Sequence, residues 1–576
     1  MTSLFRSSRR LGTTSPEESL THEELRMKHF DTPRVSPIRM GFDIRRLTLG
    51  QVLADKVAAH PDRIFIKLAA DGRAFSYDQT HRLSNRLAHG LEAVLRSVDG
   101  RRETVALLLD NCVEYLLLLF AIAKNGSVAA PVNTGARADL LAYYLNLSDA
   151  VLIITDEAHL ERVLAVRERV PTLRGIVVLR KGQTFPGDHA DVIDYAALDV
   201  ANESMPDTVV RYDDLAMLAF TSGTTGPSKA TAYTHAAVLQ GSIAYAEAWA
   251  YSPDDIYFVC LPFFHMNALR SSTYIALVVG GAVALSTRFS ASAFWKEVRD
   301  TKATTFNLLG SMLNILWAQP PSAEDGKHSA RMCRSAPMPT FAREFEKRFD
   351  IRLITTYGVS DFGTPVAFTL EDPPEKLGSA GKLQNGWNLR IVDDDDFDMP
   401  VGEVGEIVLR NNFMWGEASG YYKMPEATVV AMRNGWFHTG DLGYLDADGY
   451  LYFVGRKKDA IRRRGENISA WEVEQILLKH PAVGEVAVYA VPSEMSEDEV
   501  AASVIFKVGQ SATELEIVEY CAVRMAYFMV PRYFEFCADL PRTLSQKIEK
   551  FKLREAAQDD MSRFWDREAA GVKLAH

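Results

Sequence analysis

A short segment rich in glycine and hydroxyl groups, Thr221 to Lys229, carries the clearest chemical signal in the chain. It follows an apolar run (215–220) that is typical of a buried strand. Gly223 and Gly226 allow the backbone to turn tightly and approach an anion, and Lys229 adds a mobile positive charge. The hydroxyl groups come from Thr221, Ser222, Thr224 and Thr225. Such a loop suits a polyphosphate, although its spacing is not that of a Walker A loop. A solvated linker is the alternative, and the buried strand before the loop favours phosphate binding.

Length, charge and cysteine content place the chain among large acidic globular proteins. At 576 residues it is too long for one ordinary core, so we expect two or more domains. The formal net charge of −11 argues against nucleic acid and against an anionic membrane surface as partners. The longest apolar stretches (115–123 and 274–285) are too short or too rich in glycine to span a bilayer. Five widely spaced cysteines without a Cys-x-x-Cys pair indicate a reducing compartment, and we predict a cytoplasmic location.

Helical and strand patterns alternate from Leu47 onward and predict an α/β fold. Such alternation is typical of parallel sheets layered with helices. Thr234 has the residue type of an N-cap, for a helix that runs to about Trp249. Two hydrophobic runs between residues 388 and 410 flank an acidic turn, which predicts a β-rich subdomain. The expected strands include 104–109, 150–155, 175–179, 255–261, 282–285 and 351–356, and the expected helices include 52–60 and 84–95.

A short, charged, glycine-led segment (455–459) predicts a domain boundary. Helix and strand patterns alternate beyond it over about a hundred residues, which is a common domain size. We predict a weakly patterned N-terminal extension (1–45), a large N-terminal domain of layered α/β subdomains with the β-rich subdomain (46–455), and a small, mobile α+β C-terminal domain (456–576).

Seven further motifs follow the loop along the chain. They are Leu261-Pro262-Phe263-Phe264-His265, Ser335-Ala336-Pro337, Thr356-Tyr357-Gly358-Val359-Ser360-Asp361, Trp436-Phe437-His438-Thr439-Gly440-Asp441, Gly455-Arg456-Lys457-Lys458-Asp459, Arg464-Gly465-Glu466-Asn467-Ile468 and Leu540-Pro541-Arg542-Thr543-Leu544-Ser545-Gln546-Lys547-Ile548. With the loop they resemble the adenylate-forming superfamily of acyl-CoA ligases, adenylation domains and luciferases. One such motif would be weak evidence, whereas seven in the family's order are strong evidence.

The resemblance implies a reaction in two halves. A carboxylate attacks the α-phosphate of ATP to give acyl-AMP and pyrophosphate, and the thiol of coenzyme A then attacks the acyl carbon and releases AMP. Both halves pass through crowded anionic states, so positioning and positive charge should supply most of the catalysis. ATP, Mg²⁺ and coenzyme A are therefore the expected cofactors and co-substrates.

The same resemblance assigns roles around the nucleotide. Tyr357 would lie against adenine, Asp441 would accept both ribose hydroxyls, and Arg456 would support the ribose end. A turn residue is the alternative for Asp441. Asp361 and Thr221 would serve Mg²⁺, with Asp361 and Lys229 also counted as catalytic. The predicted nucleotide- and CoA-binding residues are Thr221, Ser222, Gly223, Thr224, Thr225, Gly226, Ser335, Ala336, Pro337, Thr356, Tyr357, Gly358, Ser360, Asp441, Arg456 and Gly465.

The C-terminal domain should supply the residues that change between the half-reactions. Lys547 is the expected catalytic lysine, which would contact the substrate carboxylate and the α-phosphate only during adenylation. A surface lysine is its alternative. Lys458 stands at the family's hinge, although an ordinary charged linker is possible there too, and Gly465 would border the tunnel for the CoA thiol.

The chain departs from the family pattern at four positions. Ser228 and Ala230 flank Lys229 where proline and glycine are usual, and Gln546 precedes Lys547 where glycine is usual. Asp361 replaces a glutamate, so its contact with Mg²⁺ could run through a water. These differences put the rate and the metal geometry in doubt, but they remove no charge that the chemistry needs.

The segment that begins at His265 defines the expected acyl pocket. With the motifs around Arg464 and Trp565, it is most similar to carnitine/crotonobetaine-type CoA ligases. The predicted substrate-pocket residues are His265, Met266, Asn267, Leu308 and Gly310, with Ala268, Leu269, Asn307 and Ser311 beside them. This neutral lining favours an apolar or modest-sized acid, and it holds no carboxylate for a quaternary ammonium.

Three functions fit the motifs. The main prediction is a ligase that joins a small carboxylic acid to free coenzyme A, with neither nucleic acid nor a membrane span involved and with a homodimer allowed. A stand-alone enzyme that loads a carrier protein is the second, and the chain contains no carrier attachment motif. The third is a degenerate ATP- or acyl-binding module. The departures motivate the third function, and the charged residues Lys229, Asp441, Arg456 and Lys547 argue against it. A luciferase-like activity fits the scaffold but is specified by nothing in the sequence.

Overall fold

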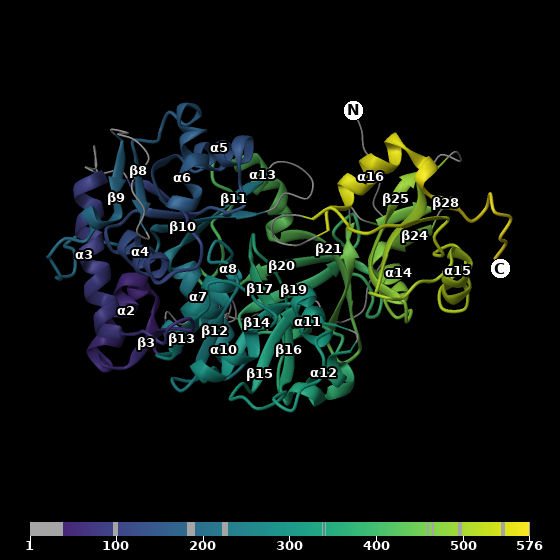
Figure 1. Cartoon of the computed structure of the whole chain (residues 1–576), viewed down its shortest axis with the longest axis horizontal. Helices are drawn as coiled ribbons and strands as arrows, with labels where there is room; N and C mark the ends of the chain where they lie inside the picture. The colour runs from purple at the N-terminus through teal and green to yellow at the C-terminus, as the bar shows by residue number, and fades with distance from the viewer. Residues whose placement is uncertain are drawn as a thin grey trace, which may run out of the picture. The chain divides into compact units, whose positions relative to one another are not determined.

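The computed structural model describes residues 38–95, 102–180, 191–221, 228–336, 338–339, 341–457, 460–463, 466–493, 498–542 and 548–574. Its first large sheet has seven strands in the order β11-β10-β6-β5-β7-β8-β9 (Figure 1). All pairings in this sheet are parallel except that of β10 with β11. The strands are β5 (Thr104–Leu108), β6 (Val128–Pro131), β7 (Ala150–Asp156), β8 (Gly175–Leu179), β9 (Val192–Asp194), β10 (Leu215–Thr221) and β11 (Lys229–Thr234).

Apolar sequence explains why helices cover this sheet. Every residue of β5 is buried, as expected for a parallel strand with both faces covered. Helix α4 (Val113–Lys124) is almost continuously apolar and is buried along its length, packed against α3. The helices of this region are α2 (Leu49–Ala59), α3 (Tyr77–Leu95), α4, α5 (Ala138–Leu147) and α6 (Glu157–Leu164).

The second sheet has thirteen strands in the order β19-β20-β21-β22-β18-β17-β16-β15-β14-β12-β13-β3-β4. Its central strands from β16 to β3 run parallel, and antiparallel strands extend it at both ends. The strands are β3 (Ile64–Leu68), β4 (Ala74–Ser76), β12 (Ile256–Val259), β13 (Ala282–Leu285), β14 (Thr305–Leu309), β15 (Met332–Ala336), β16 (Arg352–Val359), β17 (Gly363–Phe368), β18 (Gly381–Leu383), β19 (Trp387–Val392), β20 (Gly405–Asn411), β21 (Phe437–Leu445) and β22 (Tyr450–Arg456).

The β-rich subdomain predicted around residues 388–410 is an extension of this second sheet. Strands β19 and β20 pair as the expected antiparallel hairpin, with Asn388 opposite Arg410. They continue through β21 and β22 to β18 and so into the parallel strands. The sequence pattern therefore predicted the hairpin, but its continuity with the parallel strands depends on pairings that are distant in sequence.

Helix α7, which follows β11, begins where the sequence predicts, whereas α2 and α3 begin earlier than the predicted Val52 and Ser84. Thr234 caps α7 (His235–Ala248), because its Oγ1 accepts a hydrogen bond from the backbone N–H of Ala237 at 3.1 Å. The remaining helices are α8 (Met266–Ala268), α9 (Tyr274–Val279), α10 (Phe294–Thr301), α11 (Gly310–Trp317), α12 (Ala342–Phe349) and α13 (Pro425–Ala431). No helix in the described ranges combines the length and apolarity needed to cross a membrane.

The C-terminal part is a smaller α+β unit with its own core. Its sheet has the order β25-β26-β27-β28, and β23 pairs with β24 beside it. An ion pair between Arg463 Nε and Glu499 Oε2, 2.6 Å apart, lies inside this part with both side chains 2% exposed. The elements are β23 (Ala460–Arg463), β24 (Glu466–Ser469), α14 (Ala470–Leu477), β25 (Val483–Pro492), β26 (Asp498–Phe506), α15 (Glu514–Ala522), β27 (Tyr533–Phe536), α16 (Lys550–Asp559) and β28 (Trp565–Asp566). The predicted α/β fold with a smaller α+β part is confirmed.

Candidate active site

The Thr221 to Lys229 segment joins two antiparallel strands. Thr221 ends β10 and stands opposite Lys229, the first residue of β11. Ser228 is anchored from α5, since the Tyr143 hydroxyl donates to its carbonyl at 2.7 Å and the Tyr144 hydroxyl lies 3.2 Å from its Oγ. The described ends of this segment are therefore fixed, Thr221 and Lys229 by strand pairing and Ser228 by contacts from α5. Five predicted phosphate-binding residues lie outside the described residues: Ser222, Gly223, Thr224, Thr225 and Gly226.

A tyrosine that the sequence analysis did not select connects Lys229 with Asp361. The Tyr421 hydroxyl donates a hydrogen bond to Asp361 Oδ2 at 2.7 Å. The Lys229 ammonium lies 4.1 Å from the centre of the Tyr421 ring, a favourable cation–π distance. Burial and the Asp361 charge both raise the pKa of Tyr421, so this phenol stays protonated and acts as a donor. The structure thus brings two predicted catalytic residues to one aromatic side chain.

Asp441 is held by two partners from neighbouring strands. The Tyr357 hydroxyl donates to Asp441 Oδ2 at 2.9 Å, and Arg456 Nε lies 3.1 Å from Asp441 Oδ1. Arg456 is opposite Asp441 in the register of β21 and β22, which explains why these two side chains meet. Asp441 is 3% exposed. Burial first, and then the Asp441 charge, raise the pKa of Tyr357. Asp441 and Tyr357 are therefore buried and hydrogen-bonded to each other, and the partly exposed Arg456 forms an ion pair with Asp441.

The other predicted nucleotide residues lie near the carboxyl ends of β15 and β16. Ser335 and Ala336 end β15 beside the end of β14, and Thr356 donates from Oγ1 to the Val366 carbonyl of β17. Gly358 is needed because a Cβ there would lie 2.6 Å from the Gly363 carbonyl oxygen. The Ser360 carbonyl accepts a hydrogen bond from the Tyr233 hydroxyl. Carboxyl ends of parallel strands are a common place for ligands in α/β sheets.

The predicted acyl-pocket residues are distributed between the site and the core. His265 is the N-cap residue of α8, which contains Met266 and Asn267, and the Asn307 amide donates to Asn267 Oδ1 at 3.0 Å. Leu308 points to the other face of β14, is 1% exposed and packs in a core cluster. Gly310 begins α11 directly after β14.

Two buried arginines close to this pocket were absent from the sequence prediction. Arg270 is 4% exposed and borders a small gap that is also lined by Gly241 and Thr364. Arg334 is 5% exposed and donates to Asn267 Oδ1 at 2.9 Å. The sequence holds a signal for the first of them, since Arg270 is the only charged residue between positions 266 and 285.

Four predicted residues of the later motifs lie outside the described residues: Pro337, Lys458, Gly465 and Lys547. The chain on either side of the segment that carries Lys547 is nevertheless fixed. Arg542 and Ile548 form an antiparallel bridge, and the Glu549 N–H donates to the Pro541 carbonyl at 2.8 Å. Pro541 and Arg542 are therefore held next to Ile548 and Glu549.

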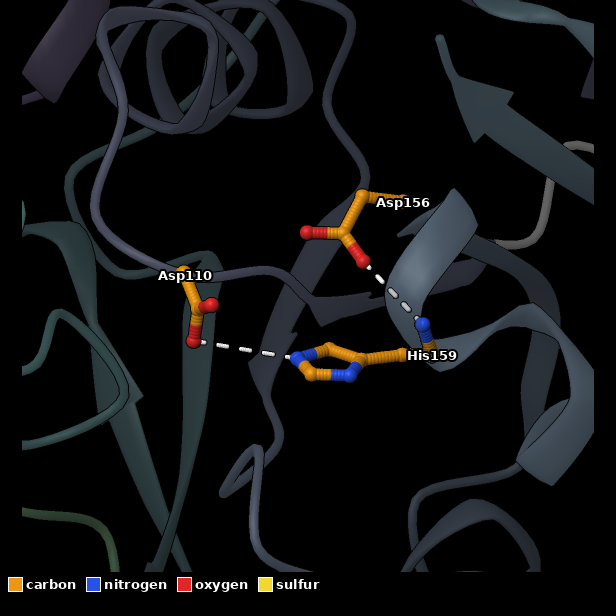
Figure 2. A group of neighbouring side chains, drawn as sticks. All are labelled: Asp110, Asp156 and His159. Carbon is orange, nitrogen blue, oxygen red and sulfur yellow. Dashed lines mark hydrogen bonds and ion pairs between the residues drawn. The ribbon is translucent and has the colours of Figure 1, made fainter. Parts of the chain in front are cut away.

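A second group of polar side chains lies where β5 and β7 of the seven-stranded sheet end and α6 begins. Figure 2 shows His159 between Asp110 and Asp156. Asp156 caps α6 by accepting from the His159 N–H at 3.2 Å, and His159 Nε2 lies 3.7 Å from Asp110 Oδ1. These contacts give each side chain a role at the start of α6, so we assign the group to local structure rather than to a metal centre.

Comparison with known proteins identifies the family. The AMP-binding enzyme family matches residues 53–422, and its C-terminal domain family matches residues 472–547. A crotonobetaine/carnitine–CoA ligase of Salmonella typhimurium is 32% identical over 517 residues, with 88% of this chain and 97% of the relative covered. The corresponding ligase of Salmonella typhi is 32% identical over 493 residues, covering 84% of this chain and 93% of the relative.

Solved structures show the same fold. Anthranilate CoA ligase AuaEII in complex with anthranoyl-AMP aligns with a TM-score of 0.78 at 25% identity, covering 89% of this chain and 97% of that one. ATP-bound MatB from Rhodopseudomonas palustris gives 0.79 at 25% identity, with coverage of 88% and 99%. o-Succinylbenzoate CoA synthetase from Bacillus subtilis, with ATP and magnesium, gives 0.75 at 26% identity, with coverage of 87% and 98%.

The chain therefore belongs to the AMP-binding enzyme family. Within this family it is an AMP-forming acyl-CoA ligase that uses ATP, Mg²⁺ and coenzyme A. It activates a carboxylic acid as acyl-AMP with release of pyrophosphate and then transfers the acyl group to CoA. The residues present fit ATP and Mg²⁺. Asp441 is a fixed, buried carboxylate, and Asp361 has the hard oxygen atoms that this cation prefers as ligands.

Proposed function

We propose that Asp441 holds the ribose of ATP while the Thr221 to Lys229 segment holds its phosphates. The fixed group of Asp441, Tyr357 and Arg456 is the observation that carries this assignment. A carboxylate has about four lone-pair sites, and the two observed contacts leave acceptor capacity for two hydroxyls. Because Arg456 and Tyr357 fix the carboxylate plane, little side-chain entropy would be lost when ATP binds.

The phosphate end is proposed to lie between Lys229 and Asp361. Lys229 would neutralise phosphate charge, and Asp361 with Thr221 would hold the Mg²⁺ that supplies further positive charge there. Tyr421 supports both roles, since it fixes the Asp361 carboxylate by a hydrogen bond and places the Lys229 ammonium over its ring. The remaining nucleotide contacts are proposed for Ser335, Ala336, Thr356, Gly358 and Ser360, together with Pro337 and the loop residues 222–226.

Lys547 is proposed as the residue of the C-terminal domain that contacts the acid and the α-phosphate during adenylation. In support, the described residues on either side of it, Arg542 and Ile548, are paired with each other. Lys458 is proposed as the hinge between domain 46–455 and domain 456–576, and Gly465 as a border of the CoA tunnel. In support, Lys457 Nζ pairs with Glu406 Oε2 at 3.0 Å and so anchors the chain just before the hinge.

The acid is proposed to bind beside His265, Met266, Asn267 and Gly310. The test is ATP-dependent pyrophosphate release over a panel of carboxylic acids, with and without CoA, and with acyl-CoA followed by mass spectrometry. Crotonobetaine and carnitine belong in the panel because the relatives carry those names. Acyl-CoA formation supports the proposal, whereas acyl-AMP without acyl-CoA would indicate a carrier-protein acceptor. A protein that binds ATP but releases no pyrophosphate with any acid would contradict the proposal.

A cytoplasmic location is proposed from the cysteines. The five cysteines, which all lie in the described ranges, form no disulfide with one another, as is usual in a reducing compartment. The homodimer stays a prediction, and light scattering on the purified protein measures it directly.

A further inference from the structure

Strand β21 contains a bulge at the residues that lead to Asp441. Glu406 of β20 lies opposite Leu442 of β21. Two positions further along β20, Val408 lies opposite His438, which is four positions away from Leu442 on β21. The stretch 439–441 of β21 is therefore matched by a single residue of β20. A bulge bends its strand and changes the direction of its side chains, and bulges are common next to active sites. The direction of the Asp441 side chain therefore depends on how this bulge is held.

The Glu406 carboxylate binds the backbone of the bulge. The Gly440 N–H donates to Glu406 Oε1 at 3.1 Å. Gly440 has a φ of 68°, a left-handed conformation that glycine adopts without strain. The extra residues of a bulge lose their places in the hydrogen-bond ladder, so their N–H groups need other acceptors. Glu406 supplies such an acceptor at the peptide directly before Asp441.

Thr439 adds a second pair of hydrogen bonds within the bulge. Its hydroxyl donates to the Ile407 carbonyl of β20 at 2.7 Å and accepts from the Asp441 N–H at 3.0 Å. The N–H groups of Gly440 and Asp441 are thus both bonded to side chains. The bulge therefore has a defined geometry, which is set by Glu406 from β20 and by Thr439 from β21 itself.

Glu406 is itself held in one orientation. It is 6% exposed, and its Oε2 accepts from Lys457 Nζ at 3.0 Å and lies 3.5 Å from His438 Nδ1. Lys457 also pairs with the exposed Asp394 at 2.8 Å. A buried carboxylate needs compensation of this kind, and here Lys457 supplies the opposite charge. Since one oxygen binds Lys457 and the other binds the bulge, the Glu406 side chain has little freedom to turn.

We propose that Glu406 is a positioning residue for ATP, which fixes the β21 bulge so that the Asp441 carboxylate meets the ribose hydroxyls. The inference rests on the proposed ribose-binding role of Asp441, and it adds a residue that acts without touching the nucleotide. Loss of Glu406 therefore weakens recognition of the ribose hydroxyls more than it weakens binding of the adenine and the phosphates.

Nucleotide binding without turnover tests this inference. Isothermal titration of the full chain with Mg²⁺ compares ATP, 2′-deoxyATP and 3′-deoxyATP. We expect the wild type to bind ATP about 10- to 100-fold more tightly than either analogue, since each ribose hydroxyl donates to a charged acceptor. Glu406→Ala should reduce this preference to a few-fold. Glu406→Gln should retain most of it, because the amide oxygen can still accept from the Gly440 N–H. The exposed Glu403→Ala is the matched control and should keep the full preference.

Asp441→Asn is the reference variant that separates this inference from the proposed function. If Asp441→Asn loses the preference for ATP and Glu406→Ala keeps it, the ribose assignment stands and the inference is overturned. An equal loss of affinity for all three nucleotides in Glu406→Ala also overturns the inference, because Glu406 would then serve only the fold. An unchanged preference in Asp441→Asn contradicts the ribose assignment itself, and the inference falls with it.

Circular dichroism and the melting temperature establish that Glu406→Ala is folded. If it is not, Thr439→Val is the second variant, since it removes the other side-chain bonds of the bulge and keeps the side-chain shape. We expect Thr439→Val to reduce the preference for ATP over both deoxy analogues. A folded Thr439→Val protein with the full wild-type preference would overturn the inference.

Discussion

At the scale of single residues, the proposed nucleotide site depends on carboxylates whose orientation is fixed before any ligand binds. Asp441 illustrates this, because Tyr357 and Arg456 hold its two oxygens from adjacent strands. Asp361 has a comparable support in Tyr421. Preorganised polar groups of this kind lose little free energy to reorganisation when a ligand arrives.

Asp441→Asn keeps the shape of the side chain and removes its charge. We expect kcat/KM for ATP in pyrophosphate release to fall by about 10- to 100-fold, since hydrogen bonds to a charged acceptor would be lost. The control is Asp448→Asn, which removes an exposed carboxylate that pairs with Lys376. Unchanged kinetics in Asp441→Asn would contradict the ribose assignment.

Tyr421→Phe separates the two contacts of this ring. The ring under Lys229 stays, while the hydrogen bond to Asp361 is lost. We expect about a 10-fold fall in the rate of pyrophosphate release and a higher Mg²⁺ requirement, because the carboxylate is no longer oriented. Tyr422→Phe is the matched control, since its hydroxyl contacts Asp149 away from the site. Equal rates for the two variants would show that Tyr421 has no positioning role.

At the scale of elements, strand alternation and register decide which side chains reach the site. Asn307 and Leu308 are neighbours on β14, yet Asn307 contacts Asn267 and Leu308 packs in the core. The sequence analysis placed both near the pocket because it could not assign faces to a strand buried on both sides. Strand positions, the Thr234 cap and the β19–β20 hairpin follow from local patterns and were predictable.

The residues that the sequence analysis missed are those positioned by contacts distant in sequence. Tyr421 reaches Asp361 across 60 positions, and the meeting of Arg334 with Asn267 depends on the packing of α8 against β14 and β15. Arginine is mostly exposed in proteins, so its burial is not expected without such contacts.

A buried histidine at the start of α7 gives the fold a pH dependence. His235 is fully buried and accepts a hydrogen bond from the Leu49 N–H at 3.4 Å. Burial, with the nearby Arg102 charge, lowers its pKa from 6.5 to about 3. The unfolded chain therefore binds the proton more readily, so stability is greatest above pH 6.5 and falls as the pH drops toward 3.

Because of His235, we expect the free energy of unfolding to be about 2 kcal/mol lower at pH 5 than at pH 8. Urea unfolding at both values measures the change. His235→Asn should reduce the loss of stability on acidification, whatever its effect at pH 8, and the exposed His60→Asn should not. An identical pH dependence in wild type and His235→Asn would contradict the proposed titration.

At the scale of the whole molecule, we expect the large N-terminal part and the small C-terminal part to divide the reaction between them. The large sheets carry Asp441, Lys229 and Asp361, whereas the small C-terminal unit contains Lys547. The fold class and the family were predictable because seven motifs occur in order along most of the chain. The substrate was not predictable, because the burial of Arg270 and Arg334 close to the proposed acyl pocket appears only in the folded structure.

Lys547→Ala tests the division between units. We expect pyrophosphate release to fall about 100-fold or more, since a positive charge on the reacting groups is lost. Transfer of the acyl group from supplied acyl-AMP to CoA should stay within a few-fold of wild type, and Lys552→Ala in α16 is the control. Equal losses in both half-reactions would contradict a role of Lys547 that is specific to adenylation.

The central claim is that this chain joins a carboxylic acid to CoA through acyl-AMP. The most direct measurement is ATP-dependent pyrophosphate release by the full chain with a panel of mono- and dicarboxylic acids, with acyl-AMP and acyl-CoA followed by mass spectrometry. We expect pyrophosphate release with at least one acid. Acyl-AMP should form when CoA is absent, and acyl-CoA and AMP should form when CoA is present. ATP binding without pyrophosphate release for every acid would contradict the claim.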